Sequence, residues 1–204
     1  MLLHGVIVAG GSALRMSGLE KPLVLLRGRP LVDHVIERIH PQVKALALNV
    51  KEEAASLYRD TAAREFPLLA DRFGGKAGPV GGVSAGLDWA AACGADWLVT
   101  VPADTPFLPR NLVERLVAQA GAGAPVVAVT KEKVQGLCAL WPVSCRAALR
   151  DGIDAGRYRS LWWTLGDLGT GHCRFEDADA FFNVNTGDDL AEAERMANTA
   201  EGPI

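Results

Sequence analysis

Apolar runs alternate along most of the chain with segments whose apolar residues recur at helical spacing. The short apolar runs predict buried strands at residues 6–9, 45–49, 68–70, 97–101 and 125–129. Helical spacing of apolar residues predicts helices at residues 31–39, 52–64, 83–90 and 109–120. This order of elements predicts an α/β fold in three layers, in which helices flank a mostly parallel sheet.

The last third of the chain has a less regular pattern. Its apolar runs predict strands at residues 137–141, 172–175 and 181–182, and its amphipathic segments predict helices at residues 144–150, 158–168 and 187–196. Thr186 or Asp188 is suited to cap the last of these helices, because either side chain can accept a hydrogen bond from an exposed backbone N–H group. With neither a repeat nor a linker in the sequence, we expect a single domain over residues 1–204.

Glycines or polar residues lie where several of the predicted strands end. Gly10-Gly11 follow the first strand, Asn49 ends the second, and Asp71 and Asp104 come after two later strands. In a parallel sheet, ligands bind in the crevice beyond the carboxyl ends of the strands. These residues are therefore candidates for one shared binding site.

The turn after the first strand has the composition of a phosphate site. Gly10 and Gly11 allow backbone N–H groups to approach phosphate oxygens, while Arg15 and Lys21 supply full positive charges. The alternative is an ordinary strand-to-helix turn with two unrelated surface cations. Neither the P-loop motif nor the fingerprint Gly-x-Gly-x-x-Gly of dinucleotide-binding proteins fits this turn.

Asp104 is the strongest candidate for a metal ligand. It follows the predicted strand at residues 97–101 and is held between Pro102 and Pro106, which restrict the backbone on both sides. Mg²⁺ prefers oxygen ligands and is usually bound by one or two carboxylates together with water and substrate phosphates. The alternative is a turn aspartate that accepts hydrogen bonds from its own backbone.

Charge and cysteine content limit the classes of function. The formal net charge is −3, from 21 basic and 24 acidic residues, which argues against a general affinity for nucleic acid or membranes. The first 31 residues nevertheless carry four cations against Glu20 alone, a balance that favours a small anionic ligand. The four cysteines show no Cys-x-x-Cys motif, and the sequence has neither a targeting signal nor a membrane span. We therefore expect a cytoplasmic protein without a zinc cluster or a disulfide framework.

Several ordered motifs resemble those of one enzyme family. Val8-Ala9-Gly10-Gly11, Arg15-Met16 and Lys21-Pro22-Leu23 are similar, in sequence and spacing, to the signature of the nucleotidyltransferases typified by molybdenum cofactor guanylyltransferase. Ser17 stands where glycine is usual. Residues 78–82, 102–107 and 183–186 also resemble segments of that family. Gly187 replaces a proline, and Gln135-Gly136-Leu137 stands where many relatives carry His-Pro.

The resemblance implies a nucleotidyltransferase with a Rossmann-like fold that transfers GMP from GTP to molybdopterin and releases pyrophosphate. It implies that residues 1–110 bind the nucleotide, that residues 111–204 bind the acceptor, and that other proteins of molybdenum cofactor biosynthesis are partners. It further implies Mg²⁺ bound by Asp104, with Arg15, Lys21 and Asp104 as the catalytic residues and Asn183 and Asn185 near the acceptor. The implied nucleotide-binding residues are Val8, Ala9, Gly10, Gly11, Lys21, Asn49, Asp71, Gly78 and Asp104.

Other functions remain open at this point. A related nucleotidyltransferase that uses CTP or a sugar-phosphate acceptor would share the first turn and Asp104, and a non-catalytic nucleotide-binding or carrier protein would share the glycines. A dinucleotide-dependent oxidoreductase lacks support, because its glycine fingerprint is missing. We interpret His34 and His172 as structural, and Trp162-Trp163 as part of the core or of an apolar wall.

Overall fold

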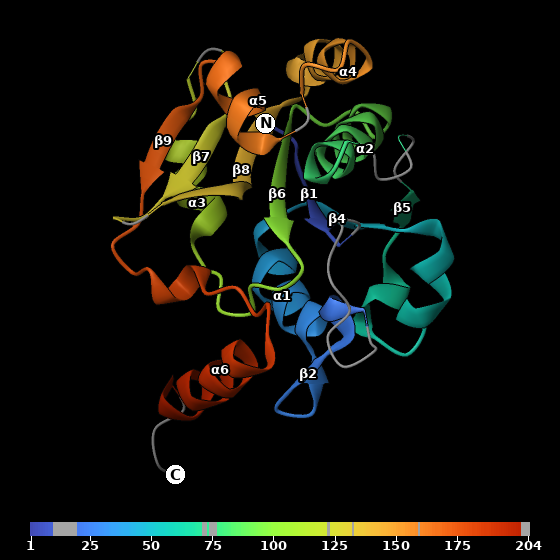
Figure 1. The fold of residues 1–204 in the computed structure, drawn as a ribbon. Coiled ribbons are helices and arrows are strands. Elements are labelled where there is room, and N and C mark those ends of the chain that lie inside the picture. Colours follow the sequence, from blue (N-terminus) through green and yellow to red (C-terminus); the bar gives the residue numbers. More distant parts are fainter. Residues whose placement is uncertain are drawn as a thin grey trace.

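The computed structural model describes residues 1–9, 20–70, 73, 77–121, 123–131, 133–158 and 160–200. A seven-stranded sheet in the order β5-β4-β1-β6-β8-β7-β9 forms its centre, with helices on both faces (Figure 1). The strands of this sheet are β1 (Leu3–Val8), β4 (Ala45–Val50), β5 (Leu68–Ala70), β6 (Trp97–Pro102), β7 (Val126–Val129), β8 (Val134–Pro142) and β9 (Gly171–Arg174). The α-helices are α1 (Leu31–Ile39), α2 (Pro79–Ala92), α3 (Leu112–Ala118), α4 (Arg146–Asp154), α5 (Leu161–Asp167) and α6 (Gly187–Ala200). The three-layer α/β prediction is confirmed.

The half of the sheet nearest the N-terminus is parallel. Strand β1 pairs in parallel with both β4 and β6, and β4 pairs in parallel with β5. The register places Val8 opposite Asn49 on one side and opposite Pro102 on the other. The residues that follow β1 and β6 therefore leave the sheet side by side at the same edge.

The other half of the sheet reverses direction at β8. Strand β8 is antiparallel to both β6 and β7, whereas β7 and β9 are parallel. The reversal follows from chain length, because only residues 130–133 separate β7 from β8. A connection this short can join antiparallel neighbours but cannot make a parallel crossover.

Apolar side chains pack on both faces of the sheet. On one face, α1 and α3 contribute Val35 and Leu116 to a buried cluster, and on the other face α2 and α5 contribute Leu87 and Leu165 to a second cluster. A smaller cluster joins α6 to the hairpin formed by β2 (Leu25–Leu26) and β3 (Arg29–Pro30). Helix α6 thereby contacts the N-terminal part of the chain, at the lower edge of the molecule in Figure 1.

Several element predictions are wrong in detail. Residues 52–64 form two 3-10 helices, η3 (Glu52–Tyr58) and η4 (Ala62–Glu65), in place of one α-helix. Thr61 separates them, because its hydroxyl donates to Tyr58 O at 2.8 Å and accepts from Ala63 N at 3.1 Å. Residues 181–182 are not a strand. Phe181 is the last residue of a further 3-10 helix, η6 (Asp179–Phe181), and Phe182 follows it. The N–H groups of Asp179 and Ala180 donate to the Asp177 carboxylate at the start of this helix.

Of the two alternatives for Trp162 and Trp163, a place in the core is wrong, whereas a place in an apolar wall agrees with the structure, in which both residues line a cavity. Both lie on α5, and 68% and 72% of their surfaces are exposed. Thr164 and Leu165 of the same helix are buried, so α5 packs through these residues and presents the two indole rings outward. None of the helices in the described residues combines the length and apolar character that a bilayer-crossing segment requires.

Candidate active site

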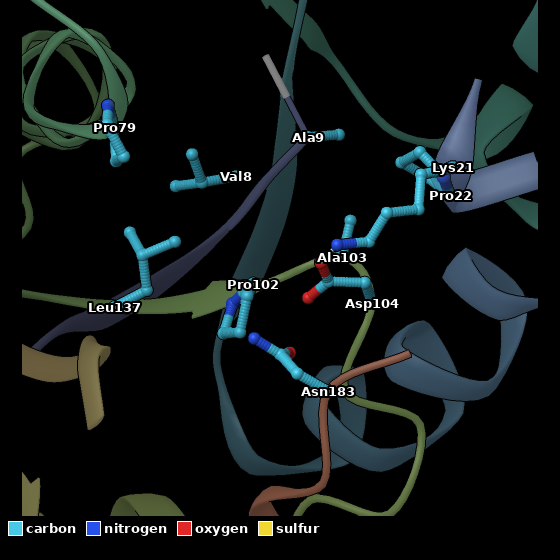
Figure 2. Close-up of a pocket in the computed structure, with 10 residues that line it drawn as sticks. All are labelled: Val8, Ala9, Lys21, Pro22, Pro79, Pro102, Ala103, Asp104, Leu137 and Asn183. Atoms are coloured by element: carbon cyan, nitrogen blue, oxygen red, sulfur yellow. Dashed lines mark ion pairs between the residues drawn. The ribbon is translucent and has the colours of Figure 1, made fainter. Parts of the chain in front are cut away.

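A cavity of about 270 Å³ opens at the edge of the sheet where β1 and β6 end (Figure 2). We call it the β1–β6 cavity. Its walls come from the ends of these strands, from the first turn of α2, from β8 and from the loop before α6. The lining residues are Val8, Ala9, Lys21, Pro22, Pro79, Pro102, Ala103, Asp104, Leu137 and Asn183. Five of the residues singled out in the sequence thus meet in one place: Val8, Ala9, Lys21, Asp104 and Asn183.

Asp104 lies just after the C-terminal end of strand β6, and backbone hydrogen bonds hold this segment on two sides. The N–H of the preceding Ala103 donates to Val8 O at 3.3 Å, and Val184 N donates to Asp104 O at 3.0 Å. The side chain is only 17% exposed. Its Oδ2 atom forms an ion pair with Lys21, while Oδ1 is buried and accepts no hydrogen bond from the described part of the chain.

Lys21 begins the 3-10 turn η1 (Lys21–Leu23), and its side chain is 9% exposed. Its ammonium group contacts both Asp104 Oδ2 and Asn185 Oδ1. A buried ammonium is costly unless opposite charge and hydrogen-bond acceptors surround it. The carboxylate and the amide oxygen together stabilise this charge at the cavity wall.

The loop before α6 supplies Asn183 and Asn185. Asn183 Oδ1 accepts a hydrogen bond from Thr105 Oγ1, which ties this loop to the segment after β6. Asn185 N and Thr186 N both donate to Asp189 Oδ2 at 2.9 Å, and Asp189 N donates to Thr186 Oγ1 at 3.1 Å. These reciprocal bonds form a capping box on α6. They lower the pKa of Asp189, chiefly through the N–H donated by Asn185.

Asn49 and Gly78 have different relationships to the cavity. Asn49 is 1% exposed, donates to Leu69 O at 3.1 Å and packs under Gly82 of α2, so it joins strands β4 and β5 to that helix. It does not contribute to the cavity wall as described. Gly78 precedes α2 with a φ of +54°, a conformation that favours glycine, and aligns the helix so that Pro79 faces the cavity.

Four of the candidate residues lie outside the described residues: Gly10, Gly11, Arg15 and Asp71. Ala9 and Lys21 line the cavity, and they are the lining residues nearest in sequence to residues 10–19, one on each side. Thr105 and Asp189 were not singled out as site residues from the sequence. Thr105 lies inside the Pro-x-Asp-Thr-Pro segment, and Asp189 stands three residues after Thr186, the spacing of a capping box.

The buried Asp104 oxygen fits a divalent cation. No group of three or more His, Cys, Asp or Glu side chains capable of holding a metal occurs among the described residues. Mg²⁺ does not require such a group, because water and substrate phosphates complete its octahedral shell. Asp104 Oδ1, which lacks a hydrogen-bond donor in the described chain, is the atom suited to this role.

Residues 5–166 match the family described as the MobA-like NTP transferase domain. The chain belongs to this family. A protein of Cereibacter sphaeroides named molybdenum cofactor guanylyltransferase is 43% identical over 96% of this chain and 97% of its own length. A protein of the same name from Acidiphilium cryptum is 41% identical over 94% of both chains. This chain is therefore a nucleotidyltransferase.

Solved structures support the same fold. The molybdopterin-guanine dinucleotide biosynthesis protein A of Archaeoglobus fulgidus matches 96% of this chain and 99% of its own with a TM-score of 0.75 at 24% identity. A 2-C-methyl-D-erythritol 4-phosphate cytidylyltransferase of Thermus thermophilus matches 95% of this chain and 98% of its own with a TM-score of 0.71 at 16% identity. At these identities the likeness establishes only the fold.

Proposed function

We propose that this chain transfers GMP from GTP to molybdopterin, forms the guanine dinucleotide of the molybdenum cofactor and releases pyrophosphate. The names of relatives about 40% identical over nearly the whole chain support this reaction. The structural observation that carries it is the meeting of Lys21 and Asp104 at the β1–β6 cavity, where the ammonium group faces a carboxylate whose Oδ1 has no hydrogen-bond partner among the described residues.

The reaction is an in-line displacement at the α-phosphorus of GTP. A terminal phosphate oxygen of the acceptor forms the new P–O bond, and the bond from the α-phosphorus to the bridging oxygen breaks. Pyrophosphate leaves with that electron pair. Such a transfer needs positioning and charge neutralisation more than covalent help from the protein.

Each motif of the site has a part in this step. Lys21 and Arg15 offset negative charge on the leaving group, and the backbone at Val8, Ala9, Gly10 and Gly11 holds phosphate oxygens. The N-terminus of α2, which follows Gly78, adds the positive end of a helix dipole, which favours bound phosphate. We assign Asn49 and Asp71 to nucleotide binding, and Asn183 and Asn185 to acceptor binding.

Asp104 is the residue that would hold Mg²⁺. A divalent cation held there would supply positive charge to the phosphates during the transfer. The carboxylate contributes one fixed oxygen ligand, and Lys21 is close enough to share the same phosphates. We further propose that the reaction takes place in the cytoplasm, with other proteins of molybdenum cofactor synthesis as partners.

Nucleotide choice distinguishes this proposal from its main alternative, a cytidylyltransferase of the same fold. Purified protein is incubated with molybdopterin, Mg²⁺ and GTP, CTP, ATP or UTP in turn, and released pyrophosphate is measured with the nucleotide product. We expect pyrophosphate and a guanine dinucleotide with GTP alone. Turnover with CTP alone would reassign the substrate, and GTP binding without any product would indicate a non-catalytic nucleotide-binding protein.

A further inference from the structure

A second cavity, of about 450 Å³, lies on α5 and the neighbouring strands. We call it the Trp162–Trp163 cavity. Its apolar surface comes mainly from the two indoles and from Val127, Val134 and Leu165, and its edge carries Asp167, Thr170 and His172. Its volume falls within the range of sites that hold small organic molecules, about 300–1,000 Å³. The two tryptophans are 68% and 72% exposed, so their ring faces are accessible to a ligand.

The Trp162–Trp163 cavity lies on the same face of the sheet as part of the β1–β6 cavity. Val8, Val127 and Leu165 belong to one apolar cluster, which Val134 and Leu137 join from its edge. Leu137 lines the first cavity and Val134 the second, and three residues of strand span about 10 Å. The ring and the phosphate of a small phosphorylated molecule can be separated by a distance of this order.

Helix α5 begins at the boundary between the two cavities. Leu161, its first residue, packs on Gly136, with Leu161 Cβ only 3.4 Å from the place a Cβ of residue 136 would take. Gly136 directly precedes Leu137 of the first cavity, and Trp162 directly follows Leu161. The start of α5, and with it the backbone of Trp162, therefore lies beside the strand that contributes Leu137 to the β1–β6 cavity.

The acceptor of the proposed reaction carries a pterin, whose flat pyrimidine ring needs a site of its own. The β1–β6 cavity, at about 270 Å³, must admit the reacting phosphates, and none of the described residues that line it is aromatic. Planar heteroaromatic rings bind favourably against aromatic side chains. A carboxylate such as that of Asp167 also matches the adjacent N–H donors along the pyrimidine edge of a pterin.

We infer that the Trp162–Trp163 cavity binds the pterin ring of the acceptor while its phosphate reaches the β1–β6 cavity. This inference rests on the proposed function for the identity of the acceptor. The cavity itself, the exposed indoles and the packing of Leu161 on Gly136 are independent of that assignment. Trp162 and Trp163 are then residues of the acceptor site and have no part in GTP binding.

Kinetics and direct binding test the inference together. In Trp162→Ala and Trp163→Ala, we expect the acceptor KM to rise about tenfold, the size of losing one stacked ring, with the GTP dissociation constant unchanged. Phenylalanine at either position should keep the KM within about threefold of wild type, since a stacking face remains. Leu57→Ala, which truncates another exposed apolar side chain remote in sequence, is the matched control and should leave both constants unchanged.

Quenching of tryptophan fluorescence by 6-hydroxymethylpterin measures ring binding without turnover. We expect saturable quenching in the wild-type protein and in Leu57→Ala, and only non-saturable quenching in the double alanine variant. Saturable quenching that persists in the double variant would overturn the inference. So would an unchanged acceptor KM, or a fall in oligomer mass with unchanged pterin binding, which would instead assign the face to contacts between copies of the chain.

The two proposals fail in different ways. Saturable, tryptophan-dependent pterin binding with no dinucleotide formed from GTP would overturn the proposed function and leave the ring site intact. Dinucleotide formation with an unchanged acceptor KM in the double variant would overturn the ring site and leave the proposed function intact.

Discussion

The ammonium group of Lys21 contacts the side-chain oxygen of Asn185, a residue 164 positions later in the sequence. This contact joins the two ends of the chain at the β1–β6 cavity. The same ammonium group forms an ion pair with Asp104. Three segments that are far apart in the sequence therefore contact one another through the side chain of Lys21. Asn185, which we assign to acceptor binding, thus contacts Lys21, which we assign to nucleotide binding.

Asp189 anchors the Asn185 side of this contact, and its removal should affect both stability and turnover. Asp189→Ala removes the acceptor of the Asn185 and Thr186 N–H groups. We expect a loss of about 1 kcal/mol in the free energy of unfolding, as for other helix caps. We also expect kcat to fall about tenfold, because Lys21 loses a fixed partner. Denaturant titration and steady-state kinetics measure the two effects.

Asp188→Ala is the matched control for Asp189→Ala. Asp188 is adjacent in the first turn of α6 and carries the same charge, but among the described contacts the capping bonds are made by Asp189. Equal effects of the two substitutions would show that charge near the helix N-terminus matters and that the anchoring of Asn185 does not.

Lys21→Ala should impair the chemical step. With one charge-stabilising donor lost at the triphosphate, we expect turnover at saturating GTP to fall by about 10²–10³-fold. Lys21→Arg keeps the charge and controls for electrostatics, while thermal unfolding of both variants checks the fold. Turnover of Lys21→Ala within twofold of wild type would rule out the assigned role.

Asp104→Ala should abolish transfer that depends on Mg²⁺, because the proposed protein ligand of the metal is removed. Activity is measured against Mg²⁺ concentration for this variant, for Asp104→Asn, which keeps the shape, and for Asp60→Ala, which removes an exposed carboxylate elsewhere. The control should behave like wild type. A magnesium dependence that survives in both Asp104 variants would contradict the assignment.

Most strands and their succession along the chain could be predicted from the sequence, because the apolar runs are continuous and separated by clear helical periods. The same pattern brought Asp104 and the end of β1 to one edge, since parallel strands share that edge. The 3-10 turns of residues 52–65 could not be predicted in this way. Their apolar residues are compatible with an α-helix, and a single side chain, Thr61, interrupts the segment.

The sequence indicated which residues belong to the site more readily than it indicated which of them contact one another. The contact between Lys21 and Asn185 depends on how α6 packs on the β2–β3 hairpin, which no local pattern reports. The resemblance to the family assigned Asn49 to the nucleotide, and its hydrogen bond to Leu69 O shows a structural role. The sequence left open whether Trp162 and Trp163 belong to the core or to an apolar wall, because large apolar side chains occur in both places.

Gly82→Ala should destabilise the protein through the packing of α2 on the sheet. A Cβ at this position would lie 2.4 Å from Asn49 Oδ1 and 2.8 Å from Val8 Cγ1, so both side chains would have to shift. We expect a loss of about 1–3 kcal/mol in the free energy of unfolding. The GTP dissociation constant should also rise, because Val8 lines the β1–β6 cavity.

Gly166→Ala is the control for Gly82→Ala in the stability measurement. Gly166 also lies within a helix, but a Cβ there would meet no atom within 4 Å in the described structure. Alanine should therefore leave stability unchanged or raise it by up to about 1 kcal/mol. A loss of stability in Gly166→Ala as large as that in Gly82→Ala would refute the close-packing explanation.

His4 should make stability sensitive to mild acid. The ring is buried in β1, its centroid lies 5.1 Å from that of Trp89, and Nδ1 has no partner among the described residues. Burial lowers the pKa of His4 below its ordinary value of 6.5. The unfolded chain therefore binds the proton more readily, and the free energy of unfolding should fall as pH drops through that value. In His4→Phe, which keeps a ring against Trp89, thermal unfolding from pH 7.5 to 5 should show a shallower decline. Parallel profiles for the two proteins would mean that other groups cause the acid sensitivity.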